Sequence, residues 1–284
     1  MTHPTDRPAT WLVTGASRGL GLHLVRALLA AGQHVAATTR STDRLLGALG
    51  ETDTTNLLPL QVQLTDQADV TPAVEETTAR FGRIDVVVNN AGYGYLGAVE
   101  ETTDADVRAM FDVQVHGTWN VLRAVLPVMR AARSGHVINV SSVLGLVSFP
   151  GWGLYCAAKY ALEGLTESLA AEVADHGIAV TIIEPGYFDT DFLTGDSLAL
   201  PETTTDAYPA IREMVAVHQA MPGTQLGDPA KAAAAFITVA ERGDGPLRQQ
   251  LGSDSSGFAA AKVEALRADV SAGRALAEST DRVR

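Results

Sequence analysis

The chain has 284 residues, of which 46% are hydrophobic and 19% charged, so it can bury a sizeable core and does not have the composition of a disordered chain. Its formal net charge of −12 at pH 7 repels the phosphate backbone, so we expect no nucleic-acid partner. We find no apolar run of the ~18–20 residues that a membrane span needs, and no signal-peptide layout at the N-terminus, so we expect a cytoplasmic protein without membrane attachment.

Apolar runs typical of buried strands alternate with helical patterns along the chain. The runs are continuous rather than alternating, as expected of strands that are covered on both faces. The predicted strands are Trp11–Thr14, His34–Thr38, Leu57–Leu64, Ile84–Asn89, His136–Ser141 and Ala179–Glu184, with a last short one near Pro246–Leu251. The predicted helices are Leu20–Ala31, Ala68–Phe81, Asp104–Ala132 and Gly153–His176. This repetition predicts an α/β fold, a doubly wound parallel sheet with right-handed crossovers in three αβα layers.

The chain shows no internal linker or shift of composition, so we expect a single domain over residues 1–284. Residues 1–9 are predicted to form a flexible leader and residues 258–284 a C-terminal helix with a frayed tail. Residues 186–227 contain no clear strand and are predicted to form a substrate lid, because such long loops in compact domains are usually functional.

A glycine-rich turn lies between the first strand and the first helix. Glycine lets the backbone approach a pyrophosphate without an intervening Cβ, and a helix N-terminus offers free N–H groups and a positive dipole end. The spacing G-x-x-x-G-x-G differs from the commoner G-x-G-x-x-G, but its position favours dinucleotide binding over a plain tight turn. The expected cofactor contacts are Gly15, Ser17, Arg18, Gly19, Leu20 and Gly21.

The residues after the second strand indicate which dinucleotide is bound. An NAD enzyme needs a carboxylate there to accept from the ribose 2′-hydroxyl, and Thr38-Thr39-Arg40 contains none. Arg40 and Arg18 instead supply guanidinium groups suited to a 2′-phosphate, unless both are merely solvated surface residues. We therefore predict NADP(H) as the cofactor.

Tyr155 and Lys159 stand four residues apart on a predicted helix and so share one face. A phenol with a pKa of ~10 is a poor acid or base near neutrality. An ammonium about 4 Å away, at an effective dielectric of ~20, favours the phenolate by roughly 4 kcal/mol. Tyr155 is therefore predicted to donate a proton to the substrate oxygen in reduction and to accept it in oxidation. Ser142, just past a predicted strand, is expected to hold and polarise the carbonyl.

The order of these motifs resembles the short-chain dehydrogenase/reductase family over roughly residues 10–260. The resemblance rests on the glycine turn, Asn89-Asn90-Ala91-Gly92, Ser142 thirteen residues before Tyr155, Tyr155-x-x-x-Lys159, and Pro185-Gly186 with Thr190. It implies a Rossmann-type sheet and an oxidoreductase.

The resemblance also implies roles that the residues alone do not establish. Lys159 would hydrogen-bond the nicotinamide ribose. Asn90, Ala91 and Gly92 would serve the adenosine and ribose side of the cofactor, and Pro185, Gly186 and Thr190 would contact the nicotinamide carboxamide. A plain turn is the competing interpretation of both glycine-containing motifs. By analogy with the family, the two long helices would pair across a two-fold axis in a homodimer or homotetramer.

Two positions depart from the family pattern. Gln114 stands where an asparagine normally helps a water relay reach the lysine, so it either replaces that function, weakens it, or marks a changed reaction. Gln63-Leu64 stands where an aspartate normally receives the adenine amino group; a glutamine carbonyl accepts the same hydrogen bond without charge.

The lid and its neighbourhood are rich in apolar side chains that could form a substrate pocket. An equally open alternative is that many of them pack against the underside of the lid or against another subunit. The candidates are Tyr187, Phe188, Phe192, Leu193, Leu198, Leu200, Tyr208, Ile211, Met214, Val215 and Met221 of the lid, with Tyr93, Tyr95, Leu96, Leu144, Phe149 and Trp152.

Cysteine and histidine usage favours neither thiol nor metal chemistry. Cys156 is the only cysteine, which excludes an internal disulfide, and we interpret it as a small buried filler. The histidines lack the i, i+4 spacing that places two ligands on one helix face, so we expect no metal site.

The leading hypothesis is an NADP(H)-dependent oxidoreductase that acts on an apolar ketone, aldehyde or secondary alcohol. The alternatives are a non-redox or transiently redox enzyme of the same fold, such as a dehydratase, isomerase or epimerase, and a cofactor-binding protein without turnover.

Overall fold

The computed structural model describes residues 3–4 and 6–282. Within these residues seven parallel strands form one sheet in the order β3-β2-β1-β4-β6-β7-β9. Their bounds are β1 (Thr10–Thr14), β2 (His34–Thr39), β3 (Leu57–Gln61), β4 (Val86–Asn89), β6 (Gly135–Val140), β7 (Ile178–Pro185) and β9 (Arg248–Leu251). The strand order reverses between β1 and β4, which makes this the switch point where open α/β sheets bind ligands. The doubly wound α/β fold is confirmed.

Helices cover both faces of the sheet and form two separate cores. One face carries α1 (Gly19–Ala30), α2 (Thr42–Leu49) and α8 (Pro229–Arg242). The other carries α3 (Gln67–Phe81), α5 (Gly117–Ala132) and α6 (Gly153–Val173). Successive side chains of a strand point to opposite faces, so Trp11 and Val13 of β1 lie in the first core and Leu12 in the second.

The helix expected over Asp104–Ala132 has a break in its middle. It begins as α4 (Asp104–Phe111), passes through a π-helical turn at Asp112–His116, and continues as α5. A π turn widens the helix by one residue and is frequent at functional sites. Here it contains Gln114, whose carbonyl accepts a hydrogen bond from Thr118 Oγ1 at 2.8 Å. Hydrophobic periodicity does not distinguish such a turn from a regular helix.

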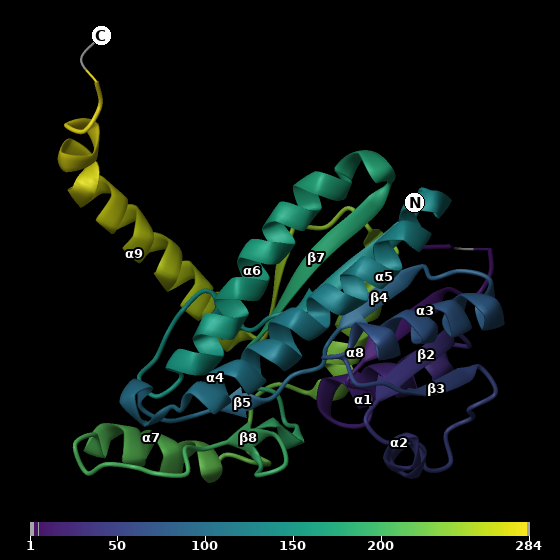
Figure 1. Ribbon diagram of the computed structural model, residues 1–284, viewed down its shortest axis with the longest axis horizontal. Coiled ribbons are helices and arrows are strands. Elements are labelled where there is room, and N and C mark those ends of the chain that lie inside the picture. The colour runs from purple at the N-terminus through teal and green to yellow at the C-terminus, as the bar shows by residue number, and fades with distance from the viewer. Residues whose placement is uncertain (1–2, 5, 283–284) are drawn as a thin grey trace.

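Three helices were missing from the sequence prediction. Helix α2 is only eight residues long, with Ser41 as its N-cap. Helix α8 begins with Asp228 as N-cap and Pro229 in its first turn, a start signal that the prediction overlooked. Helix α7 (Pro209–Gln219) lies inside the expected lid, where Figure 1 shows it beside β8.

The lid is joined to the body by a small two-stranded sheet. Strands β5 (Gly94–Tyr95) and β8 (Leu198–Ala199) pair in parallel and tie the lid to the loop that follows β4. Within the lid, His218 is buried, and its Nδ1 must donate to the Met214 carbonyl at 2.8 Å. Its Nε2 is hydrogen-bonded to the Tyr187 hydroxyl at 2.9 Å, which fixes α7 over the end of β7.

Both ends of the described chain differ from expectation. Part of the predicted leader is fixed, because Arg7 pairs with Asp85 and Ala9 is fully buried; residues 1–2 and 5 lie outside the described residues. The C-terminal helix α9 (Ser253–Glu278) begins earlier than the predicted residue 258 and extends away from the body (Figure 1). Residues 283–284 of the predicted tail also lie outside the described part. Among the described helices, none is long and apolar enough to cross a membrane.

Candidate active site

A cavity of about 790 Å³ opens at the carboxyl ends of the central strands. That is a suitable size for a cofactor and a small substrate. All but one of the residues predicted for the site line it; Gly21 is the exception. The lining set is Gly15, Ser17, Arg18, Gly19, Leu20, Arg40, Gln63, Leu64, Asn90, Ala91, Gly92, Gln114, Ser142, Tyr155, Lys159, Pro185, Gly186 and Thr190.

The glycine turn has the close backbone packing that a phosphate cradle requires. Gly15 has φ +65°, and a Cβ there would lie 2.7 Å from Ala91 Cα. A Cβ on Gly21 would lie 2.5 Å from Asn90 Nδ2, so Gly21 packs α1 against the turn instead of facing the cavity. Helix α1 then starts at Gly19 after Arg18, with no side-chain cap on its first N–H groups. These residues fit an anionic group at the helix N-terminus.

Asn90 fastens β4 to the glycine turn. Its Nδ2 donates to the carbonyls of Thr14 at 2.9 Å and Gly15 at 3.2 Å. Its own backbone N–H and that of Ala91 both donate to Thr14 Oγ1. The Asn90 side chain is therefore used to shape the cradle.

Three arginines line one end of the cavity: Arg18, Arg40 and Arg44. Burial, followed by the positive charges of Arg40 and Arg44, lowers the pKa of Arg18. Arg44 comes from the unpredicted helix α2 and was missed by the sequence analysis. Ser41, a typical N-cap residue, was the one sequence signal for this short helix. From the lid, the Asp196 carboxylate pairs with Arg44 at 2.7 Å, and its carbonyl accepts from Arg18.

Tyr155 and Lys159 are brought together by the first turns of α6, and both are almost completely buried. Lys159 Nζ donates to the Val140 carbonyl at 2.9 Å and lies 5.5 Å from the centre of the Tyr155 ring. Ser142 follows β6, and its Oγ accepts from the backbone N–H of Leu144 at 3.1 Å. The three side chains line one end of the cavity.

The electrostatics of this group differ from the prediction. Burial raises the pKa of Tyr155 above its ordinary value, and the Ser142 side chain only partly offsets this effect. Burial also lowers the pKa of Lys159 to about 7, against the opposing charge of Glu163. Burial is the largest influence on both groups, so the pKa of Tyr155 is raised where the sequence led us to expect it lowered.

Gln114 presents an unused hydrogen-bond acceptor. Its Nε2 donates to the Tyr93 carbonyl at 2.9 Å and also contacts Met110 Sδ. Its Oε1 is buried and finds no partner among the described residues. A Cβ on Gly92 would lie 3.1 Å from this oxygen, so glycine there keeps the space beside it open.

Aromatic side chains enclose the space around Tyr155. Its ring lies 5.6 Å from Trp152 and 5.6 Å from Phe192, both in edge-to-face geometry. The predicted pocket residues that line the cavity are Tyr93, Leu144, Phe149, Trp152, Tyr187, Phe188, Phe192, Leu193 and Leu198. Others of that set pack in the core cluster behind them, namely Tyr95, Leu96, Met214, Val215 and Met221, and Ile211 is buried nearby, against Gly151.

Two further predictions concern individual residue types. Cys156 is buried in the same cluster, as a filler should be. In the described part of the chain, no group of three or more His, Cys, Asp or Glu side chains is placed to hold a metal ion. Phe258 of α9 was not predicted, yet it lines the cavity beside Phe149.

A family model described as short chain dehydrogenase matches residues 9–199. The chain belongs to the short-chain dehydrogenase family. This short-chain dehydrogenase is 35% identical to Oxidoreductase BOA17 of Botryotinia fuckeliana (strain B05.10), over 91% of this chain and 94% of that protein. A 3-ketodihydrosphingosine reductase of Bacteroides thetaiotaomicron is 38% identical over 66% of each chain.

Solved structures agree with this membership. A short-chain dehydrogenase from Streptomyces avermitilis has a TM-score of 0.88 at 38% identity, covering 97% of this chain and all of that one. The structure of ElxO with NADP bound has a TM-score of 0.70 at 25% identity, covering 86% and 96%. The family resemblance inferred from the motifs is confirmed.

Proposed function

We propose that this short-chain dehydrogenase is an NADP(H)-dependent oxidoreductase that transfers hydride between nicotinamide and an apolar ketone, aldehyde or secondary alcohol. One observation carries the proposal. A single cavity joins an uncapped helix N-terminus with a glycine cradle at one end to Tyr155, Lys159 and Ser142 at the other. A dinucleotide is long enough to span such a site and place its reactive ring beside the phenol.

The arginine cluster supports NADP(H) over NAD(H). Arg18, Arg40 and Arg44 repel one another, and a 2′-phosphate would relieve that repulsion through charge-assisted hydrogen bonds. The Thr38-Thr39-Arg40 segment at this end carries no carboxylate to receive a ribose 2′-hydroxyl. The NADP-bound state of the relative ElxO is consistent with this choice.

At the nicotinamide end, the chain's own residues handle the proton. Ser142 holds the carbonyl oxygen, and Tyr155 donates its phenolic proton to that oxygen as the carbonyl carbon receives the hydride. A bound NADPH would supply the hydride and would itself be oxidised to NADP⁺. Burial raises the pKa of the Tyr155 phenol, so the phenol carries the proton that reduction of a carbonyl requires.

Lys159 and Gln114 support this proton transfer. Lys159 stabilises the phenolate that remains and would also bind the nicotinamide ribose. The unpaired Oε1 of Gln114 is suited to hold a water, in place of the family's asparagine. Apolar substrates are favoured because the walls around Tyr155 are aromatic.

The test is to mix the purified protein with NADPH and a panel of apolar ketones and to follow the absorbance of the reduced nicotinamide. Steady consumption is the expected result. Product without net consumption of NADPH supports an epimerase or isomerase instead, and binding without product supports a protein without turnover.

The matched variant is Tyr155→Phe, which removes only the hydroxyl. We expect turnover to fall by about 10²–10⁴-fold while NADPH binding is retained, because general acid catalysis contributes roughly that factor. A phenylalanine variant with a near-normal rate contradicts the assigned role of the phenol.

A further inference from the structure

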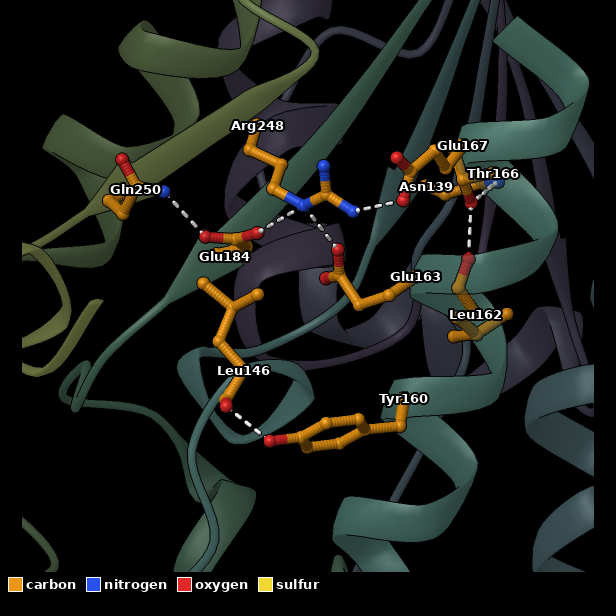
Figure 2. A network of polar contacts seen from close by, with 10 residues as sticks. All are labelled: Asn139, Leu146, Tyr160, Leu162, Glu163, Thr166, Glu167, Glu184, Arg248 and Gln250. Atoms are coloured by element: carbon orange, nitrogen blue, oxygen red, sulfur yellow. Dashed lines mark hydrogen bonds and ion pairs between the residues drawn. The ribbon is translucent and has the colours of Figure 1, made fainter. Parts of the chain in front are cut away.

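A cluster of buried charges lies one helical turn beyond Lys159. Glu163 follows it on α6 with 6% of its side chain exposed, and Glu184 on β7 is fully buried. Arg248 on β9 lies between these two carboxylates and the exposed Glu167 (Figure 2). None of these side chains lines the cavity.

The contacts of the cluster leave it short of positive charge. Arg248 Nε is 3.0 Å from Glu163 Oε2 and 3.6 Å from Glu184 Oε1, while its Nη2 donates to Glu167 at 2.9 Å. Gln250 Nε2 donates to the other oxygen of Glu184 at 2.6 Å. Glu163 Oε1 has no hydrogen-bond partner among the described residues. One guanidinium therefore faces two buried carboxylates.

Lys159 is a buried cation on the same helix as Glu163. It and Glu163 stand four residues apart on one helix face, a spacing at which side chains interact. Both groups are buried, so their attraction is weakly screened. Burial lowers the pKa of Lys159 and the charge of Glu163 raises it. Burial, and then the charge of Glu163, raises the pKa of Glu184 to about 7.

We infer that Glu163 is a positioning residue that keeps Lys159 protonated, and that Arg248 and Glu184 set how strongly it does so. Burial raises the pKa of Glu163, whereas the side chains of Ser141, Arg248 and Glu184 lower it and so favour its ionised form. The consequence for turnover rests on the proposed function. The protonation of the lysine does not, because it is a property of the protein alone.

The surroundings of the pair hold few other groups that could have this effect. Lys159 faces Tyr155 on its own helix and the Val140 carbonyl of β6. Glu163 faces Arg248 from β9, Glu184 from β7 and Ser141 at the end of β6. Among these, Glu163 is the one that raises the pKa of Lys159.

The experiment uses the small number of lysines in the sequence, which are Lys159, Lys231 and Lys262. Protein labelled with ¹³C at the lysine ε-carbon gives one resonance for each, and Lys159→Met identifies the buried one. Titration in Glu163→Gln should show the midpoint of Lys159 lowered by about one to two pH units, the size expected for a charge one turn away.

The matched control is Glu167→Gln, which removes a carboxylate from the same arginine on the same helix. Its side chain is 64% exposed, so water screens it and the Lys159 midpoint should stay unchanged. Glu163→Asp keeps the charge and should restore most of the midpoint. A cluster that merely fastens β9 to α6 would lower the melting temperature in Glu163→Gln without moving the lysine titration.

An unchanged Lys159 midpoint in folded Glu163→Gln overturns the inference, whatever the activity. The arginine keeps two carboxylates in that variant, so we expect it to fold; otherwise Glu163→Met, which replaces the carboxylate with an apolar side chain, serves the same purpose. If the wild-type protein reduces ketones, the alkaline limb of its pH profile of kcat/KM should move to lower pH in Glu163→Gln. The size of that move should equal the fall in the Lys159 midpoint. If the Lys159 midpoint falls but the pH profile of kcat/KM does not move, the inference about lysine protonation stands and only its consequence for catalysis is contradicted.

Discussion

The pKa values of individual side chains in this site depend more on desolvation than on pairing with a charged neighbour. Tyr155 and Lys159 are both buried, and burial shifts the pKa of each toward its neutral form. At the other end of the cavity, three arginines lie close together, and the Asp196 carboxylate that pairs with Arg44 is largely exposed.

Arg44→Ala tests the arginine end. We expect the Kd for NADPH to rise by about tenfold or more, since a hydrogen bond to a charged group is worth ~1.5–3 kcal/mol, while the Kd for NADH changes little. Fluorescence titration of both nucleotides checks this. Arg108→Ala, which removes an exposed arginine that does not line the cavity, is the control. An equal rise for both nucleotides removes the argument for a 2′-phosphate site.

Local motifs carried most of the residue-level prediction. The glycine turn and the Tyr155–Lys159 pair could be read from the sequence because their geometry is set by a turn and a helix within a few residues. Arg44 could not, because it joins the site only through the packing of α2. The pKa values of Tyr155 and Lys159 could not be predicted either, since burial is a property of the folded chain.

Single elements are placed by polar anchors at their ends as well as by the apolar cores. The start of β4 is fixed by Asp85, whose fully buried carboxylate accepts from Arg7 at 2.9 and 3.0 Å and from the Thr10 N–H at 2.9 Å. Arg83 adds a third cation contact at 2.6 Å. Burial alone would raise the pKa of Asp85, but these partners together lower it.

Asp85→Asn should lower the free energy of unfolding at pH 7 by about 3 kcal/mol, because breaking a buried ion pair strands its partners. The folded pKa lies below the ordinary value near 3.8, so the stabilisation is complete above that pH and is lost as the pH falls through the folded value. Denaturant titrations between pH 7 and pH 2 measure this. Asp104→Asn, from an exposed pair, should change stability by less than ~0.5 kcal/mol.

The sequence predicted the strands and long helices of the sheet because their apolar runs are long and uninterrupted. The π turn around Gln114 escaped prediction because one inserted residue barely changes the apolar pattern. Helix α2 escaped because eight residues give too few repeats. Strand β3 was drawn too long, since the apolar run continues to Leu64 whereas the chain turns at Gln63, whose carbonyl accepts from the Asp66 N–H.

At the scale of the whole molecule, the cavity is assembled from distant parts of the chain. The cradle comes from β1 and β4, the proton-handling side chains from the loop after β6 and from α6, and part of the wall from the last helix. Asp254 at the start of α9 accepts from the Tyr187 N–H at 2.7 Å, and Phe258 lies 5.2 Å from Phe149. The outer part of α9 is different, since Val263, Val270 and Leu276 are more than half exposed.

Deletion of residues 263–284 should therefore leave the melting temperature within about 2 °C of the full chain, because the removed side chains bury little surface in this structure. NADPH binding should also persist, as Asp254 and Phe258 remain. A differential scanning measurement at two protein concentrations checks this. A large, concentration-dependent drop would mean that the outer helix is covered in solution by another copy of the chain.

Helix α9 is anchored to the body at its start, and its far end is free. Its 26 residues form a rod about 39 Å long, since a helix rises ~1.5 Å per residue. The rod is fixed at Asp254, whose carboxylate fits against Gly186 and Gly252, and its far end lies in solvent (Figure 1). A small rotation at this anchor moves the tip much further, so a probe attached to the free end would report displacements of the cavity wall that Phe258 lines.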